Sequence, residues 1–379
     1  MEISEIAQRV TPSPTRHLYN LAKNYTDTID LTLGDPDLQP IEPIKQAACD
    51  CIHAGKTRYS SNAGLSELRK KISLDINKTY NISSSDENII VTVGGMEALY
   101  LTFLTILNPG DEVIVFAPHY VNYVEMIKMC NAIPVIISTD ENNYFEVGRE
   151  QIEQSISHKT KAIIINNPNN PTGHIYSHAF LNNIFELGKK YGLYIISDEV
   201  YKELIYKEKF ESIFKEISDN LILIDSFSKK HCMTGWRIGY AAGPEFLISA
   251  MTKLQENIAA CAPVISQYAA ITALDYPMPA VNIAEFKKRR DLLIEAFKDN
   301  QKLHLVVPEG AFYAFVNIGK LGMKSLQFCE ALLKKYHVAV APGIAYGAEY
   351  DNYIRIAFTL SCDRLKEGIN RIKTFAESV

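Results

Sequence analysis

The feature that most constrains the fold of this chain is a regular alternation of short apolar runs with helical stretches between residues 88 and 257. The apolar runs have the length and composition of buried strands, and we predict strands at residues 88–93, 112–117, 134–139, 161–166, 194–199, 221–226 and 238–243. Helices are predicted at residues 97–106, 121–130, 177–191 and 244–257. This alternation predicts an α/β fold with a mainly parallel, doubly wound, seven-stranded sheet flanked by helices.

The pattern changes after residue 280. A long charged helix at 282–299 precedes predicted strands at 304–308, 312–318 and 353–358 and helices at 325–336 and 364–377, which predicts a smaller α+β domain. The first thirty residues are polar, with Pro12 and Pro14, and we expect an arm rather than a core element. We therefore expect an N-terminal arm and part of the small domain in residues 1–40, a large domain in 41–280 and a small C-terminal domain in 281–379.

Charge and cysteine content argue against several classes of protein. The 379 residues carry a formal net charge of -5 and no dense run of lysine and arginine, so no nucleic-acid partner is expected. No apolar run reaches about 18 residues, and the acidic start of the chain does not resemble a secretory signal. The seven scattered cysteines fit reduced thiols in the cytoplasm, and no metal-site spacing is present.

A lysine at the end of a predicted strand is the strongest functional signal. Lys229 follows the apolar run 221–224, and α/β proteins place their chemistry at the carboxyl ends of strands. Ser226, Ser228 and the guanidinium fork of Arg237 could hold a phosphate beside it. A lysine next to a bound phosphate suggests a Schiff base with pyridoxal phosphate, PLP. Taken alone, the segment is equally compatible with two solvated lysines, Lys229 and Lys230, on a loop.

Two more predicted strands end in polar motifs. Residues 166–173 read Asn-Asn-Pro-Asn-Asn-Pro-Thr-Gly, and turn chemistry would explain these residues by itself. The strand 194–199 ends in Asp198, with Tyr201 three residues later, and an aspartate there could be a helix cap. The order and spacing of the three segments together are hard to explain by capping and turns.

With these motifs the chain resembles the PLP-dependent aminotransferases of the aspartate aminotransferase superfamily, fold type I, classes I and II. The resemblance covers nearly the whole chain. Its motifs are Leu33-Gly34-Asp35-Pro36-Asp37, Tyr59, Gly94-Gly95, Pro118-His119-Tyr120, Asn170-Pro171-Thr172-Gly173, Asp198-Glu199-Val200-Tyr201, Ser226-Phe227-Ser228-Lys229, Arg237 and Arg355. The asparagine and lysine segments are the most specific of these.

The resemblance implies a role for each residue around the cofactor ring. Lys229 would hold PLP as a Schiff base and then act as general base and acid between Cα of the substrate and the cofactor. Asp198 would pair with the ring nitrogen and keep it protonated. Tyr201 and Asn170 would donate hydrogen bonds to the ring oxygen, and Tyr120 would lie against the ring face, with His119 a weaker candidate.

Further residues would hold the phosphate and the substrate. Gly94 and Gly95 would bring backbone N–H groups to the phosphate at the start of a helix near Met96. Ser226, Ser228 and Arg237 would complete that phosphate site. Arg355 would bind the substrate α-carboxylate, with Gly34 and Asn170 close to the same group. Arg355 could equally make a structural salt bridge.

The resemblance also implies a homodimer with shared active sites, because Tyr59 reaches the phosphate of the partner subunit in this family. The substrates would be an L-amino acid and a 2-oxo acid. The aspartate-specific branch often has a basic residue after the glycine pair, where this chain has Met96, and no replacement cation can be identified from the sequence. A PLP-dependent C–S lyase of the same fold and a non-enzymatic regulatory module are the alternatives. The module is disfavoured because too few residues precede Leu31 for a DNA-binding domain.

Overall fold

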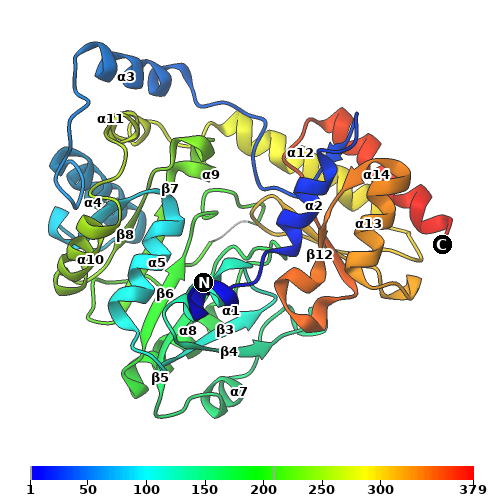
Figure 1. Ribbon diagram of the computed structural model, residues 1–379, viewed down its shortest axis with the longest axis horizontal. Helices are drawn as coiled ribbons and strands as arrows, with labels where there is room; N and C mark the ends of the chain where they lie inside the picture. Colours follow the sequence, from blue (N-terminus) through cyan, green and yellow to red (C-terminus); the bar gives the residue numbers. More distant parts are fainter. Residues whose placement is uncertain (1, 208–209) are drawn as a thin grey trace.

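A computed structural model describes residues 2–207 and 210–379. Its largest feature is a seven-stranded sheet in the order β2-β8-β7-β6-β5-β3-β4 (Figure 1). β8 runs antiparallel to both of its neighbours, and the other pairs are parallel. The strands are β2 (Ile89–Thr92), β3 (Glu112–Ala117), β4 (Ile133–Ser138), β5 (Thr160–Asn166), β6 (Tyr194–Asp198), β7 (Leu221–Ser226) and β8 (Gly239–Ala242). The predicted seven-stranded, mainly parallel sheet is confirmed.

Helices cover both faces of this sheet, because alternate residues of each strand point to opposite sides. Ile163 and Ile165 of β5 join one core, and Ala162 and Ile164 join the other. The first core is packed by α3 (Glu42–His53), α4 (Ser66–Tyr80), α7 (Arg149–Gln154), α8 (His178–Tyr191) and α11 (Val264–Ala273). The second is packed by α5 (Gly94–Ile106), α6 (Asn122–Met129) and α10 (Glu245–Ile258). The four predicted helices are present, and α3, α4, α7 and α11 were not predicted.

The register of the central strands brings their polar ends to one edge of the sheet. Asn166 at the end of β5 lies opposite Asp198 at the end of β6. Asp198 in turn lies opposite Ile224 of β7, two residues before Ser226. Because parallel strands end at the same edge, three motifs that are far apart in the sequence meet there.

The C-terminal part forms a smaller α+β unit around a four-stranded antiparallel sheet in the order β12-β13-β10-β9. Its strands are β9 (His304–Val306), β10 (Tyr313–Asn317), β12 (Ala341–Pro342) and β13 (Tyr353–Ala357). Helices α12 (Ala280–Phe297), α13 (Ser325–Tyr336) and α14 (Cys362–Glu377) pack against it (Figure 1). The N-terminal part contributes β1 (Ile29–Asp30), which pairs in parallel with β11 (Val338–Ala339). The boundaries at residues 40 and 280 stay a prediction.

The expectation that the first thirty residues form only an arm is wrong. They contain two helices, α1 (Glu5–Arg9) and α2 (Pro14–Ala22). Leu18 and Ala22 of α2 are buried in the core of the smaller unit. The apolar side chains recur four residues apart, so one face of a mostly polar helix is enough to bury it.

In residues 2–207 and 210–379, no helix combines the length and apolarity that a bilayer crossing needs. The same residues contain no group of three or more His, Cys, Asp or Glu side chains placed to hold a metal ion.

Candidate active site

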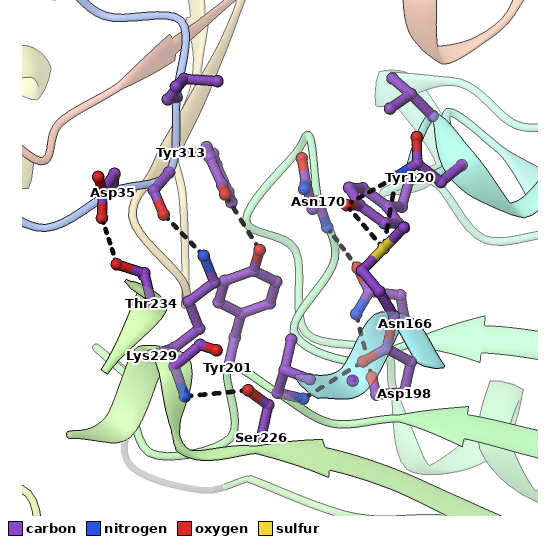
Figure 2. Close-up of a pocket in the computed structure, with 18 of the residues that line it drawn as sticks. Asp35, Tyr120, Asn166, Asn170, Asp198, Tyr201, Ser226, Lys229, Thr234 and Tyr313 are labelled. Atoms are coloured by element: carbon purple, nitrogen blue, oxygen red, sulfur yellow. Dashed lines mark hydrogen bonds between the residues drawn. The ribbon is translucent and has the colours of Figure 1, made fainter. Parts of the chain in front are cut away.

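A cavity of about 560 Å³ opens where β5, β6 and β7 end (Figure 2). One wall comes from these strand ends and the start of α5. The other comes from the N-terminal segment and the C-terminal unit. Among its lining residues are most of the predicted site residues: Gly34, Gly95, Met96, Tyr120, Asn170, Asp198, Tyr201, Ser226, Ser228, Lys229, Arg237 and Arg355.

Lys229 reaches this cavity from α9 (Phe227–Lys230), a single helical turn that directly follows β7. The turn begins because the Ser226 hydroxyl accepts a hydrogen bond from the Ser228 N–H at 2.9 Å. The Lys229 ammonium donates to the Gly34 carbonyl at 2.7 Å (Figure 2). Burial lowers the pKa of Lys229 from 10.5 to about 8, and the positive charges of Arg355 and Arg237 lower it too. A substantial neutral fraction near pH 8 suits a lysine that must act as a nucleophile and base.

Asp198 is buried at the end of β6, with its carboxylate in the cavity (Figure 2). The Tyr123 hydroxyl donates to its Oδ2 at 2.5 Å, and the Val200 N–H donates to Oδ1 at 3.4 Å. Burial raises the pKa of Asp198 from 3.8 to about 7 despite these two hydrogen bonds. A buried carboxylate in this state would gain much from a cation placed next to it.

The neighbouring strand carries a second buried aspartate with different partners. Asp225 accepts from the Lys202 ammonium at 2.6 Å and from the Tyr240 hydroxyl at 2.8 Å. Its other oxygen accepts from the Ser226 N–H at 2.6 Å. Lys202 and Asp225 therefore form a buried ion pair, and Asp225 stands two residues before the lysine-bearing turn.

Arg355 joins the C-terminal unit to the asparagine loop. It projects from β13, and its Nη1 donates to the Asn170 side-chain oxygen at 2.9 Å. Its Nη2 donates to the Thr32 carbonyl. Its Nε is buried and has no hydrogen-bond partner among the described residues, so one donor stays available for a ligand.

Tyr313 of β10 links the residues around Lys229. Its hydroxyl lies 3.0 Å from the Tyr201 hydroxyl, and its ring lies 4.3 Å from the Arg355 guanidinium carbon. A Cβ at Gly34 would lie 1.8 Å from the Tyr313 hydroxyl. Glycine is therefore required at position 34 for the N-terminal segment to approach this closely.

The start of α5 and Arg237 form the opposite end of the cavity. α5 begins at Gly94 and has no side-chain cap. Gly94 has φ +76°, and a Cβ there would lie 2.7 Å from Arg237 Nη2. Arg237 itself has φ 54° and donates to the Thr234 carbonyl at 2.9 Å. An uncapped helix start beside an arginine and two serines is a favourable place for a phosphate.

The sequence pattern of the family "Aminotransferase class I and II" matches residues 26–372. The chain belongs to this family. Because members of this family are PLP-dependent aminotransferases, this chain is one as well. The relatives found give no support to the alternative of a C–S lyase. The aspartate aminotransferase of Thermotoga maritima is 37% identical, covering 99% of this chain and 98% of that protein. That of Bacillus subtilis is 36% identical, covering 100% of this chain and 99% of that protein.

Solved aminotransferase structures share the whole fold. The crystal structure of the Thermotoga maritima aspartate aminotransferase superimposes with a TM-score of 0.95 at 36% identity, covering 99% of this chain and 100% of that one. A Thermus thermophilus aspartate aminotransferase with maleate gives a TM-score of 0.92 at 31% identity, with the same coverage of both chains. The relation therefore extends over both units of the protein.

The cavity of this aminotransferase fits the family's cofactor. The uncapped, glycine-rich start of α5 and Arg237 provide donors for a phosphate. Burial leaves Asp198 with a raised pKa that a ring cation would relieve. Lys229 reaches the same cavity and is buried enough to lose its proton readily.

Several predicted residues lie in other environments. Tyr59 is 87% exposed and does not line the cavity. His119 is buried and does not line the cavity, and its Nδ1 lies 3.0 Å from the Tyr120 carbonyl oxygen. Lys230 turns away from the cavity and pairs with Glu203 at 3.0 Å. Cys232, three residues after Lys229, is a buried free thiol.

Sequence reasoning missed four contributors to this aminotransferase site. Tyr123 does not line the cavity but holds the Asp198 carboxylate from behind through its hydroxyl. Tyr313 lies inside the predicted strand 312–318. Tyr346 and the segment 13–16 also line the cavity. No local motif marks them, because only the docking of the C-terminal unit and α2 brings them there.

Proposed function

We propose that this aminotransferase moves an amino group from an L-amino acid to a 2-oxo acid in a ping-pong sequence through Lys229. The observation that carries the proposal is a half-buried lysine with a lowered pKa in the same cavity as a buried carboxyl group, Asp198, which makes no ion pair with the described residues. PLP, when bound, supplies an electrophilic carbonyl for the amino group and a ring that spreads the charge left when Cα loses its proton.

Lys229 would have two tasks. Its neutral amine would hold the cofactor between turnovers, and after release it would remove the proton from Cα of the substrate and return it to the cofactor carbon that carried the carbonyl. The hydrogen bond to the Gly34 carbonyl aims its nitrogen toward the substrate side of the cavity. Two aromatic rings beside the ammonium exclude water. The Lys229 nitrogen lies 5.9 Å from the centre of the Tyr201 ring and 5.5 Å from the centre of the Phe312 ring.

Asp198 would stabilise a protonated ring nitrogen. A cation at this point would lower the pKa of Asp198 from its raised value, so that it binds as a carboxylate. Tyr123 would hold the carboxylate in one orientation through its 2.5 Å hydrogen bond. Tyr120 would lie against the ring face, and its hydroxyl donates to Met96 Sδ at 3.4 Å, which orients both side chains.

Tyr201 and Asn170 would donate to the ring oxygen, and Tyr201 is already oriented by Tyr313. Arg355 would bind the substrate α-carboxylate, with Asn170 and Gly34 beside it. A planar guanidinium suits this role because it can donate two parallel hydrogen bonds. At the opposite end, the phosphate would be held by Gly94, Gly95, Ser226, Ser228 and Arg237.

We also propose a homodimer in which Tyr59 reaches the partner's active site. A tyrosine that is 87% exposed in one subunit is well placed to be covered by another. Tyr59→Ala and Lys229→Ala subunits mixed under exchange conditions should regain activity, because one site of the mixed dimer has both residues intact. Proven exchange without recovery would contradict sharing.

A donor scan tests the proposed reaction. Protein loaded with PLP is offered aspartate, glutamate, alanine and aromatic amino acids with 2-oxoglutarate, pyruvate or oxaloacetate, and the new amino acid is quantified. Release of pyruvate and sulfide from cysteine without any acceptor would favour a lyase instead. We place the reaction in the cytoplasm, which the seven unpaired cysteines support.

A further inference from the structure

A second cavity, of about 330 Å³, opens beside the residue that follows the asparagine motif, His174. None of its described lining residues also lines the active-site cavity. His174 comes directly after Gly173, and 10% of its side chain is exposed. The proposed reaction gives this buried, titratable side chain no role.

Both ring nitrogens of His174 lie close to carboxylate oxygens. Nε2 lies 3.3 Å from Oε1 of Glu146, and Nδ1 lies 3.1 Å from Oε2 of Glu309. A neutral imidazole has a proton on one nitrogen only, so its other nitrogen would turn a lone pair toward a carboxylate. Only the imidazolium presents a proton to both oxygens. The geometry therefore favours a positively charged His174, and we call His174 with Glu146 and Glu309 the histidine clasp.

Other groups hold the two carboxylates of the clasp in their ionised form. Glu146 accepts from the Ser177 N–H at 2.5 Å and from the Ser177 hydroxyl at 2.7 Å, and Glu309 pairs with Lys207. Burial raises the pKa of Glu309, but His174 and Lys207 outweigh burial and lower this pKa to about 2. Burial lowers the pKa of His174, but the hydrogen bonds to Glu146 and Glu309 outweigh it and raise this pKa above 6.5.

The other described titratable side chains at this cavity are Tyr144, Tyr176, His178, Lys207 and Glu211. Tyr176 meets His174 edge to face, with ring centres 5.5 Å apart. Burial raises the pKa of Tyr176, so this side chain stays neutral. His178 is mostly exposed and pairs with Glu211 at 2.6 Å. The charge on His174 is therefore governed by Glu146 and Glu309.

The clasp ties the asparagine loop to the C-terminal unit. The N–H groups of Glu309 and Gly310 donate to the Gly173 carbonyl at 2.9 and 2.8 Å. A Cβ on Gly173 would lie 2.5 Å from Cβ of Pro308, so the loop and the turn before β10 are in close contact. The pair between His174 and Glu309 adds a charged contact to this backbone junction.

The same two parts of the chain meet again inside the active-site cavity. Asn170, in the loop that ends at His174, accepts from Arg355 at 2.9 Å. Arg355 of β13 lies opposite Phe315 of β10, the strand that follows Glu309. A change in how the turn at Glu309 sits on the loop therefore moves Arg355 relative to Asn170.

We propose that protonated His174 is a positioning residue, which holds the asparagine loop against the C-terminal unit and so keeps Asn170 and Arg355 in register for the substrate carboxylate. Loss of the His174 proton weakens the clasp and with it the binding of substrate. This inference rests on the roles proposed for Asn170 and Arg355 in transamination.

The first test measures maleate binding to PLP-loaded protein by calorimetry. Maleate is the carboxylate present with the Thermus thermophilus enzyme. His174→Gln keeps a hydrogen-bond donor but cannot carry the charge. Near pH 6 it should bind maleate about three- to tenfold more weakly than wild type, the size of one charge-assisted hydrogen bond. The two affinities should converge toward about pH 9.5, where wild-type His174 has lost its proton.

His178→Gln is the matched control, because His178 lines the same cavity but pairs with Glu211 at the surface. It should bind maleate as wild type does at every pH. Glu309→Gln is a second variant, which removes one negative charge beside His174 and keeps the shape of the side chain. The fall in maleate affinity that depends on His174 should then occur at lower pH. An unchanged affinity in His174→Gln, or a loss that is the same at every pH, would overturn the proposal.

Urea denaturation of cofactor-free protein tests the clasp without any reaction. The folded-state pKa of His174 is raised above 6.5, so its stabilisation is complete below pH 6.5 and is lost as pH rises through the folded-state value. The urea midpoint of wild type should exceed that of His174→Gln most near pH 6, and the difference should shrink toward about pH 9.5. A difference independent of pH would refute the charged clasp.

Steady-state kinetics separate a positioning role from a catalytic one. Near pH 6, His174→Gln should raise KM for the best donor about three- to tenfold and leave kcat within about twofold of wild type. A loss in kcat with unchanged KM would contradict positioning of the carboxylate site. Absence of turnover with every donor would refute the transamination, while the urea midpoints would still report on the clasp.

Discussion

The two walls of the cavity are built in different ways. The cofactor-facing wall consists of strand ends and the turns that follow them, with Asp198 as the last residue of β6 and Lys229 in the turn after β7. The substrate-facing wall consists of side chains from the N-terminal segment and the C-terminal unit, with Arg16 and Arg355 339 positions apart in the sequence (355 − 16). The register of one sheet fixes the first wall, whereas the second exists only when separate parts of the chain dock. Damage to the first wall should therefore remove chemistry, and damage to the second should weaken the binding of substrate.

The largest expected effect lies in the cofactor-facing wall. Lys229→Ala should lower kcat by about a thousandfold or more, since general acid–base catalysis alone contributes about 10²–10⁴-fold. Borohydride should fix labelled PLP to the wild-type protein and not to the variant, as mass spectrometry of peptides would show.

Lys230→Ala is the matched control for that prediction. Its ammonium pairs with Glu203 at 3.0 Å outside the cavity, so turnover should stay within about twofold of wild type, as for most substitutions away from a site. Label found on Lys230 would overturn the assignment of Lys229.

A smaller effect is expected in the substrate-facing wall. Arg355→Lys keeps the charge but loses the planar fork that donates to Asn170 and leaves Nε free. Its kcat/KM should fall by roughly ten- to a thousandfold, by a similar factor for every donor, because all share the α-carboxylate. A loss confined to acidic donors would contradict the proposal that Arg355 binds the α-carboxylate.

The smallest effect concerns stability without cofactor. The folded-state pKa of Asp198 is raised to about 7 from 3.8, so the unfolded chain releases this proton first as pH rises. Asp198 thus lowers the stability of the fold progressively between about pH 4 and pH 7, by roughly 1.4 kcal/mol per pH unit at most. Asp198→Asn should remove this dependence of stability on pH. Without cofactor at pH 8, the free energy of unfolding from urea denaturation should therefore be a few kcal/mol higher for the variant than for wild type.

The difference between the variant and wild type should shrink toward pH 4. A pH-independent difference would mean that the substitution acts through packing, and no difference would mean that Asp198 ionises freely in the folded protein. Restoring PLP should remove most of the wild-type penalty, because a ring cation favours the carboxylate.

Sequence patterns predict the cofactor-facing wall well because its information is local. Each strand is marked by an apolar run, and each functional residue follows its run within a few positions, as Asp198 and Lys229 do. The hydrogen bond between Arg355 and Asn170 cannot be predicted in this way, because no local pattern indicates which loop a distant arginine contacts. The resemblance to a family suggested both residues but not their contact.

Helix α2 was not predicted, although its sequence contains a pattern that could have revealed it. Thr15, Leu18 and Ala22 recur at spacings of three and four, which is the signature of a buried helical face. Two prolines and polar neighbours obscured it. The position of Arg16 beside the cavity could not be predicted even so, because it depends on how α2 packs against the C-terminal unit.

The ion pair between Lys202 and Asp225 restricts how this sequence can change over time. Both charges are buried, and either one left alone would cost about 3–5 kcal/mol, enough to unfold a marginal protein. Random mutagenesis that alters one codon at a time would therefore find both positions nearly invariant. Replacing the two together by uncharged residues of similar size would open a route that single steps cannot reach, so descendants of this chain should keep or lose the two charges as a unit.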